Sequence, residues 1–205
     1  MCTPFMHCLF KTNFGYNFSV HMGELVYNPV IRKNATENPM RIRRIGESDV
    51  EMVMEELKRW KEGSTEVPEA IRKGAFGHFE FGFKHFIGMD SSLFVVSENP
   101  ENGSLYGVSG ASIDDTERAI SGYSVRLGKV RTGSVLLSEK LKTIFAIPRI
   151  SEVETQITSA KGYGLAEKFY FKIKPSTEPG VDNDIGVLTR PNYERLVNDH
   201  PEYFG

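Results

Sequence analysis

The chain is poor in cysteine, carries almost no net charge and has no long apolar run. Cys2 and Cys8 are the only cysteines among 205 residues, too few and too close to one end to suggest a disulfide framework or a cysteine-based zinc site. A formal net charge of -2 argues against a nucleic-acid binder that relies on a broad positive face. No segment approaches the roughly 20 apolar residues that cross a bilayer, and residues 1–10 lack the basic leader of a signal peptide. We therefore expect a cytoplasmic protein whose partners include neither nucleic acid nor a membrane.

The composition is typical of one folded domain. Hydrophobic residues make up 40% of the chain and charged residues 25%, which is usual for a globular protein. A length of 205 residues suffices for one domain and is short for two. Residues 1–39 are rich in aromatic side chains and low in charge, whereas a regular pattern begins at Met40. We expect an N-terminal extension over residues 1–39, with its order left open, and a single domain over residues 40–205.

The first part of this domain alternates and then repeats with a helical period. Alternation from Arg41 to Ile45 predicts a short strand, and Ser48 and Glu51 have the spacing of a capping box. Apolar side chains then follow three or four residues apart: Val50, Val53, Met54, Leu57 and Trp60. This stripe predicts a helix with one buried face. Residues 68–84 start like a helix, but their glycines and phenylalanines predict an irregular segment, either a mobile wall of a substrate pocket or a packed aromatic loop.

The second part predicts a run of strands and then strands alternating with helices. Turn residues at 99–103 join strands over 93–96 and 105–113, and a third strand is expected over 122–130. The later periods predict a helix, a strand, a helix and a strand, over residues 134–147, 150–158, 165–173 and 185–189. This order indicates an α/β fold (an α+β mixed sheet), with a central, mostly antiparallel sheet flanked by helices.

Parts of this order resemble a known family. Ile157-Thr158-Ser159-Ala160, followed by Leu165 to Lys172, is similar to the late strand and the helix with a Phe-Tyr pair in the GNAT superfamily of N-acyltransferases. The Arg41 to Ile45 strand with its helix resembles the family's opening, and Phe94 to Ile113 resembles the hairpin before its cofactor strand. The resemblance covers about residues 40–189. It implies a GNAT-like acyltransferase fold with acetyl-CoA as co-substrate.

The family's most diagnostic element is a turn in which a basic residue and two glycines let backbone amides approach the CoA pyrophosphate. The corresponding stretch here reads RLGKVRTGSVLL, and Gly133 with the residues after it matches the end of the motif. Arg126 and Gly128, however, lie two places too early, and Arg131 stands where a glycine is usual. Either the turn is longer by two residues, with Lys129 and Arg131 offsetting the missing glycine, or it no longer binds CoA. The resemblance implies these CoA contacts: Leu127, Gly128, Lys129, Arg131, Thr132, Gly133 and Ser134.

Acyl transfer by direct attack needs a group that accepts the amine proton and one that protonates the departing thiolate. Tyr170 stands where the family often keeps a tyrosine as general acid, and a phenol with a pKa of about 10 can donate at neutral pH. It is equally well interpreted as an amphipathic core residue. For the general base we select Glu154, on the strand before the Tyr170 helix. Its rivals are Glu98, Asp114, His78 and His85. The sequence contains no metal-ligand motif.

These features predict an N-acyltransferase that moves an acetyl or short acyl group from acyl-CoA to a primary amine of a small molecule or protein. The alternative is a catalytically silent GNAT-like module that binds a partner protein or a small ligand. The irregular glycines of the cofactor turn favour this alternative, as do the aromatic side chains of residues 1–39 and 76–86, which would suit an interface. The oligomeric state is left open, with a homodimer as the assembly considered.

Overall fold

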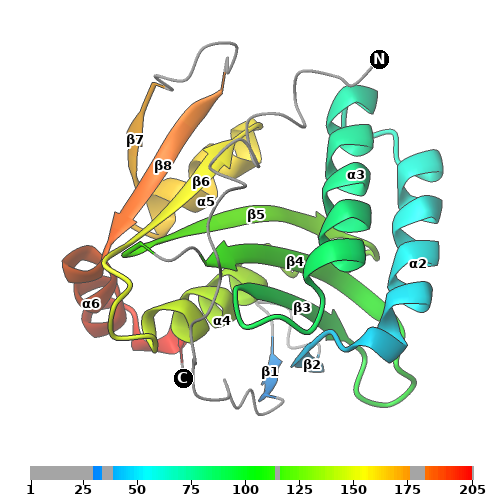
Figure 1. The fold of residues 1–205 in the computed structure, drawn as a ribbon, viewed down its shortest axis with the longest axis horizontal. Helices are drawn as coiled ribbons and strands as arrows, with labels where there is room; N and C mark the ends of the chain where they lie inside the picture. The colour runs from blue at the N-terminus through cyan, green and yellow to red at the C-terminus, as the bar shows by residue number, and fades with distance from the viewer. Residues whose placement is uncertain (1–29, 34–38, 114–115, 176–182, 205) are drawn as a thin grey trace.

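The computed structural model describes residues 30–33, 39–113, 116–175 and 183–204 and shows a single eight-stranded sheet (Figure 1). The strands are β1 (Val30–Lys33), β2 (Pro39–Arg44), β3 (Ser92–Glu98), β4 (Leu105–Ile113), β5 (Arg118–Arg126), β6 (Glu152–Ile157), β7 (Lys172–Lys174) and β8 (Asp184–Thr189). They lie in the order β1-β2-β3-β4-β5-β6-β8-β7. Neighbouring strands run antiparallel, except that β5 and β6 run parallel.

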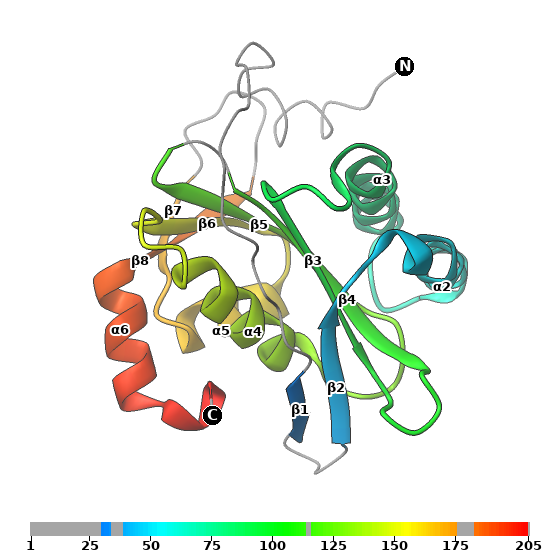
Figure 2. The same ribbon diagram turned by 60° about the horizontal axis from the view of Figure 1, so that its bottom comes forward.

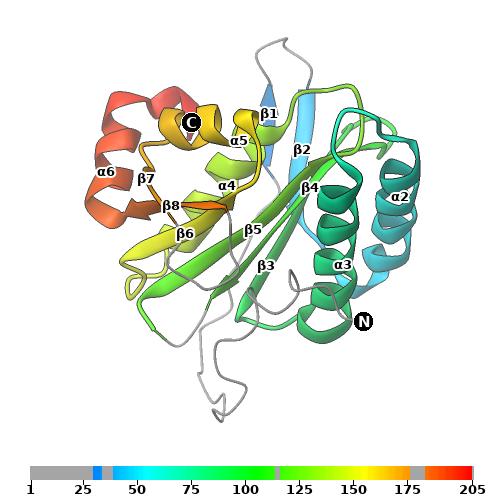
Figure 3. The ribbon, with the colours of Figure 1, turned by 90° about the horizontal axis from the view of Figure 1, so that it is seen from above.

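The described residues form five α-helices, which cover both faces of the sheet (Figures 2 and 3). They are α2 (Val50–Gly63), α3 (Glu69–Phe86), α4 (Gly133–Phe145), α5 (Ala160–Lys168) and α6 (Arg190–Asp199). Helices α2 and α3 lie side by side on one face, whereas α4, α5 and α6 lie on the other. Two single-turn 3-10 helices are added, η1 (Glu47–Asp49) and η2 (Pro201–Tyr203). Within these described ranges, no helix has the length and apolar character needed to cross a membrane.

Each face of the sheet has its own hydrophobic core. On the α2/α3 face the buried residues include Val53, Leu57, Phe79, Phe83, Phe94, Val96, Val108 and Val125. On the other face they include Val95, Ala119, Leu136, Leu141, Ile144, Val153, Leu188 and Leu196. Burial of each large apolar side chain contributes roughly 1.5–3 kcal/mol, so both layers stabilise the sheet between them. The prediction of a mostly antiparallel mixed sheet flanked by helices is confirmed.

Strand β1 lies inside the segment expected to be an N-terminal extension. Val30–Lys33 pairs antiparallel with residues 39–42 of β2. One strand of the sheet therefore precedes Met40. The aromatic side chains expected to mark the extension fall at residues 1–29, which lie outside the described residues.

Helix α3 is the largest departure from the sequence prediction. It is an 18-residue helix over a segment predicted to be irregular. Its glycines allow close packing, because a Cβ atom on Gly82 would lie 2.7 Å from Cζ of Phe94. Phe79 and Phe83 are buried on the same side, and these core contacts outweigh the helix penalty of about 1 kcal/mol for each glycine. The irregular-segment prediction was wrong for this reason.

The start of α2 also differs from the prediction. The capping box of Ser48 and Glu51 is not formed, since α2 begins after η1 and no side chain caps it. Instead, the Asp49 carboxylate accepts a hydrogen bond of 2.9 Å from the Gly46 amide and bonds of 2.7 and 2.9 Å from Arg43. Hydrogen bonds between ionised groups are about twice as strong as neutral ones, so the pairing with Arg43 decides how the chain enters the helix.

Helix α5 ends five residues before the predicted position 173, at Lys168. Tyr170 has a φ of 60°, a left-handed conformation that costs a side-chain-bearing residue roughly 1–2 kcal/mol. The turn is held by the amide of Phe171, which donates to the Ala166 carbonyl at 2.9 Å, and by burial of Phe169 and Phe171. The chain thereby leaves the helix and returns as β7.

Candidate functional site

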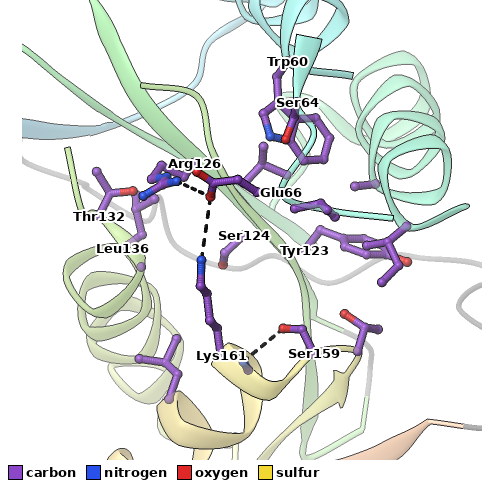
Figure 4. Close-up of a pocket in the computed structure, with 18 of the residues that line it drawn as sticks. Trp60, Ser64, Glu66, Tyr123, Ser124, Arg126, Thr132, Leu136, Ser159 and Lys161 are labelled. Atoms are coloured by element: carbon purple, nitrogen blue, oxygen red, sulfur yellow. Dashed lines mark hydrogen bonds and ion pairs between the residues drawn. The ribbon is translucent and has the colours of Figure 1, made fainter. Parts of the chain in front are cut away.

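The two parallel strands at the centre of the sheet diverge and leave a cavity between them. Strands β5 and β6 pair only from Arg118↔Glu152 to Ser121↔Thr155, although β5 continues to Arg126 along β4. The cavity has a volume of about 1100 Å³ and is lined by both strands, by the first turns of α4 and α5, and by the connection from α2 to α3 (Figure 4). This volume is slightly above the usual range for small-molecule sites, roughly 300–1,000 Å³.

A β-bulge lies in the cavity wall on β5. Ala111 pairs with Ser121 and Ser109 pairs with Ser124, so that two residues of β5 oppose Gly110 alone on β4. The extra residue leaves backbone groups without a partner in the ladder. It also shifts the alternation of the side chains, so that residues after the bulge point to the opposite face from the one they would otherwise have. The five β5 residues from Ser121 to Val125 all line the cavity. The bulge therefore brings backbone polar groups to the cavity wall.

The N-terminus of α4 also opens on the cavity. The helix begins at Gly133, and its N-cap residue Thr132 makes no side-chain capping bond. The first amides of a helix have no partner within it, and they carry a partial positive charge. No acidic residue lies in the first turn of this helix, and Thr132, Gly133 and Leu136 line the cavity. This end of the cavity is suited to an anion.

The charged side chains that line the cavity are mostly basic. They are Arg59, Arg126, Lys129, Arg131 and Lys161, against Glu56 and Glu66. Glu66 accepts a hydrogen bond of 2.6 Å from Arg126 and lies 3.7 Å from Nζ of Lys161 (Figure 4). The carboxylate of Glu66 thus connects β5 to α5 across the cavity.

The wall formed by α2, α3 and their connection is largely apolar. It includes Trp60, Val67, Ile71 and Ala75, and Tyr123 of β5 lies on the same side (Figure 4). Burial raises the pKa of the Tyr123 phenol, so the phenol is a neutral hydrogen-bond donor at physiological pH. The cavity therefore has a basic end at α4 and an apolar, aromatic wall at α2 and α3.

Most of the residues expected at the cofactor turn line this cavity. They are Leu127, Gly128, Lys129, Arg131, Thr132 and Gly133. Ser134 is not among the lining residues, and its carbonyl accepts a hydrogen bond of 2.7 Å from Ser138 within α4. The structure thus brings the turn, the helix end and the cavity together.

The two residues expected to be catalytic do not line the cavity. The Tyr170 hydroxyl donates to Asp199 of α6 at 3.1 Å, and this hydrogen bond raises the pKa of the phenol. Glu154 lies 3.4 Å from Arg118 and 3.7 Å from Lys174, although the next strand residues, Thr155 to Ile157, do line the cavity. The catalytic roles of Tyr170 and Glu154 stay predictions, and their positions argue against direct contact with a ligand in the cavity.

The rival bases that the structure describes, Glu98, His78 and His85, are also not among the lining residues. Glu98 is 1% exposed and pairs with Arg41 and Arg43, a structural ion-pair network. His85 packs against the Phe81 ring at 4.4 Å, while Asp114 lies outside the described residues. His78 is half-buried, and its ring packs against those of Phe79 and Tyr123.

The phenylalanines of α3 are buried or half-buried, and none of them is exposed. Phe79 and Phe83 are 0% and 3% exposed, and their rings contact Phe94 of β3. Among the described residues, the exposed large hydrophobic side chains are Met52 and Met89. The described part of the chain also has no cluster of His, Cys, Asp and Glu that could hold a metal ion.

Sequence reasoning missed the residues that the α2–α3 connection brings to the cavity. Glu66 and Trp60 lie about 60 positions before Tyr123 and Ser124 of β5 in the sequence, yet all four residues line the same cavity. No local motif marks such residues. Only the antiparallel pairing of α2 and α3 on one face of the sheet places them there.

No protein-family model matches the chain, and no curated protein matches it. Solved structures do. An uncharacterized protein from Bacillus halodurans has a TM-score of 0.59 at 12% identity, over 86% of this chain and 98% of that one. The PaiA N-acetyltransferase of Thermoplasma acidophilum, in complex with coenzyme A, has a TM-score of 0.51 at 16% identity, over 73% and 98%. A GNAT-family acetyltransferase of Streptococcus pneumoniae has a TM-score of 0.52 at 15% identity, over 72% and 96%.

The acceptors named for further similar structures differ in chemistry: an aminoglycoside, spermidine and an alanine of ribosomal protein S5. Each of these structures is less than 25% identical to this chain, so the likeness is one of fold. The chain has the fold of the GNAT acetyltransferases, as the resemblance implied.

Proposed function

We propose that this chain is an N-acyltransferase that moves an acetyl or short acyl group from acyl-CoA to a primary amine. The observation that carries the proposal is the uncapped N-terminus of α4, which opens on the cavity where β5 and β6 diverge. A fold by itself does not imply a function. Here, however, the helix end and the basic side chains suit the phosphates of acyl-CoA, and the cavity between the diverging strands suits its pantetheine arm.

The phosphates of CoA would bind at the basic end of the cavity. The amides of the first turn of α4 and its dipole favour an anion there. Lys129 and Arg131 lie in the turn just before the helix and line the cavity, so they can add charge-assisted hydrogen bonds. This favours the interpretation of a cofactor turn that is two residues longer and still binds CoA.

The pantetheine arm would follow β5 into the divergence. Beyond Ser121 the edge of β5 that faces β6 has no strand partner among the described residues, and an extended ligand can use the backbone groups of such an edge as an added strand does. The bulge at Gly122 and Tyr123 would then lie near the thioester. Amides that a bulge leaves unpaired can stabilise negative charge that develops on a carbonyl oxygen.

In the reaction, the amine nitrogen attacks the thioester carbonyl carbon. The new C–N bond forms as the C–S bond breaks, CoA leaves as the thiolate, and one proton leaves the amine. The acceptor would enter past Trp60 and Tyr123, on the apolar wall opposite the helix end. Whether Tyr170 or Glu154 transfers a proton stays a separate prediction, because neither lines the cavity.

A catalytically silent binding module is the second candidate. The observation that favours it is that Arg131 stands where a family glycine is usual. Its second support is weaker than expected, since none of the phenylalanines of α3 is exposed: Phe79 and Phe83 are buried, and Phe76, Phe81 and Phe86 are half-buried.

Calorimetric titration with CoA and acetyl-CoA, followed by a thiol-release assay with a panel of primary amines, tests the proposal. We expect binding of both nucleotides and amine-dependent release of CoA. Binding without release for any amine would favour the silent module. The absence of binding at millimolar nucleotide would contradict the proposal.

A further inference from the structure

A lysine side chain is fully buried beside the cavity. Lys140 of α4 is 0% exposed, and its Nζ atom donates to Oγ of Ser109 at 2.8 Å and to the carbonyl of Gly110 at 3.2 Å. Burial lowers the pKa of this amine to about 7. No carboxylate among the described residues offsets this effect by raising the pKa. A buried amine without a paired anion is held near the point at which it loses its proton.

The hydroxyl of Ser109 links this amine to the cavity. Its Oγ atom lies 2.7 Å from Oγ of Ser124, the residue paired with it on β5, and 3.5 Å from the Tyr123 carbonyl. Ser109 is 0% exposed, whereas Ser124 is exposed and lines the cavity (Figure 4). A continuous line of hydrogen-bonding groups therefore runs from the interior of the domain to the cavity wall.

The bulge on β5 makes this line possible. In a regular strand, residues 121 and 124 would point to opposite faces of the sheet. Without the extra residue, Ser124 would therefore point toward α2 and α3, and only Ser121 would point toward α4. The observed register instead pairs both Ser121 and Ser124 with β4 residues of the α4 face. The same irregularity that opens backbone groups to the cavity also places a hydroxyl there.

We propose that Lys140, Ser109 and Ser124 form a proton relay that accepts the amine proton during acyl transfer. As the C–N bond forms and the C–S bond breaks, the amine proton passes to Ser124 Oγ. When Lys140 is neutral, one N–H still donates to the Gly110 carbonyl, and the lone pair of Nζ accepts from the Ser109 hydroxyl, so that the bond seen in the ammonium form is reversed. The hydroxyl proton of Ser124 passes to Ser109, and that of Ser109 passes to Nζ of Lys140, which becomes an ammonium. CoA leaves as the thiolate, and Lys140 later returns the proton to solvent by the same route. The inference rests on the proposed function, with Ser124 as the group that touches substrate and Ser109 and Lys140 acting through it.

The charged and titratable neighbours are compatible with a neutral lysine. His78 of α3 lies on the face of the sheet opposite Lys140. Its ring packs closely against Gly122, where an added Cβ atom would lie 2.6 Å from Nε2. Burial and then the charge of Lys140 lower the pKa of His78 to about 4, so His78 is neutral at physiological pH. On α4 itself, Glu139 interacts with Tyr193 of α6, and Lys142 donates to the carbonyl of Phe204 at 3.3 Å.

Two variants interrupt the relay at its ends. Lys140→Met removes the amine while keeping an unbranched apolar side chain in the core, and Ser124→Ala removes an exposed hydroxyl with little risk to folding. Lys142→Met is the matched control, because it removes a positive charge two residues further along the same helix. We expect kcat to fall about 100-fold in both relay variants, with CoA affinity unchanged, and to stay unchanged in the control.

The pH dependence separates a relay from a merely structural role. In the wild type, kcat should rise with pH and level off above an ionisation near pH 7, and this ionisation should be absent from Lys140→Met. NMR titration of Cε-labelled lysine gives the pKa of Lys140 directly, with the resonance assigned by its loss in that variant.

The outcomes are distinct. A wild type without acyl transfer at any pH overturns the proposed function and the relay with it. A wild type that transfers, with Ser124→Ala equally active, overturns the relay alone. A Lys140 pKa at its ordinary value near 10.4 likewise overturns it, whatever the activity.

Discussion

The carboxylate of Glu66 accepts a hydrogen bond of 2.6 Å from Arg126 and lies 3.7 Å from Lys161. One anion therefore joins the α2–α3 connection to β5 and α5 across the candidate site (Figure 4). Arg126 and Lys161 line the same cavity as Lys129 and Arg131. In the proposed function, the phosphates of CoA would therefore compete with the Glu66 carboxylate for Arg126 and Lys161.

Removal of the Glu66 charge should strengthen CoA binding. Glu66→Gln frees Arg126 and Lys161, and we expect the dissociation constant of CoA to fall about threefold at low salt, with a smaller change at high salt. Calorimetry at two ionic strengths measures this. Glu69→Gln is the control, because Glu69 pairs with Lys73 on α3 and should leave CoA affinity unchanged. Weaker binding by Glu66→Gln would contradict the competition.

A negative charge at the first residue of α4 should weaken CoA binding without loss of stability. Gly133 has room for a side chain, since the nearest atom to an added Cβ is Cδ2 of Leu165 at 3.9 Å. Gly133→Asp should raise the dissociation constant about tenfold, while the helix dipole stabilises the carboxylate and maintains the melting temperature.

Gly133→Asn has nearly the same shape without the charge, so it should stay within about threefold of the wild type. Calorimetry and thermal unfolding of both variants provide the comparison. Equal loss of affinity in the two variants would show that bulk, not charge, matters at this position.

Loss of the Tyr170 hydroxyl should not slow acyl transfer. The hydroxyl donates to Asp199, and Tyr170 does not line the cavity. We therefore expect Tyr170→Phe to keep kcat within about twofold, because a general acid must reach the departing group by direct contact or through one water. Steady-state kinetics with acetyl-CoA check this. A fall of 100-fold or more would restore Tyr170 as the general acid predicted from the resemblance.

A methyl group at Gly82 should destabilise the domain. Its Cβ atom would lie 2.7 Å from the Phe94 ring, and overpacking of a core costs about 1–3 kcal/mol. Gly63→Ala is the control, since nothing lies within 4 Å of an added Cβ there, and the change should stabilise by about 0.4–1 kcal/mol. Urea unfolding measures both free energies. Equal stability of Gly82→Ala and the wild type would mean that Phe94 moves aside at little cost.

Acid should reduce the free energy of unfolding through His78. Burial lowers its folded-state pKa to about 4, whereas an unfolded histidine titrates near 6.5. Above about pH 6.5, His78 is neutral in both the folded and the unfolded state, so its contribution to the free energy of unfolding is fully present. As the pH falls toward 4, the unfolded state binds the additional proton, so stability is lost by up to about 1.4 kcal/mol per pH unit.

Urea unfolding of the wild type and of His78→Gln between pH 7 and pH 4 tests this. We expect a less steep pH dependence for the variant in that range. Parallel curves would show that His78 does not carry the effect.

Several parts of the fold could be predicted from local patterns. The alternation around Ile42 and the stripe of Val53 and Leu57 predicted β2 and α2, because side-chain periodicity follows directly from backbone geometry. The turn before Gly133 was expected from the family resemblance to contact CoA, and the structure shows that it lines the cavity, while its binding of CoA stays a proposal. A helix end needs only a few consecutive residues to expose its amides.

The failures have a physical cause in long-range contacts. Residues 68–84 were expected to be irregular because of their glycines and phenylalanines, yet they lie mostly in α3, where the close approach of Phe94 favours a glycine at position 82. The predicted capping box of Ser48 and Glu51 does not form, and the ion pair between Asp49 and Arg43 of the preceding strand holds the start of the helix instead.

The sequence by itself determined the order of most elements, the mixed sheet and the turn before α4 that lines the cavity. Only the tertiary structure decided where β5 and β6 diverge, that Tyr170 points to Asp199, and that Lys140 is connected through Ser109 to Ser124. The reason is the range of the interactions. Periodicity and helix ends depend on neighbouring residues, whereas a cavity, a buried amine and a hydrogen-bonded line depend on segments that are brought together only when both faces of the sheet are covered.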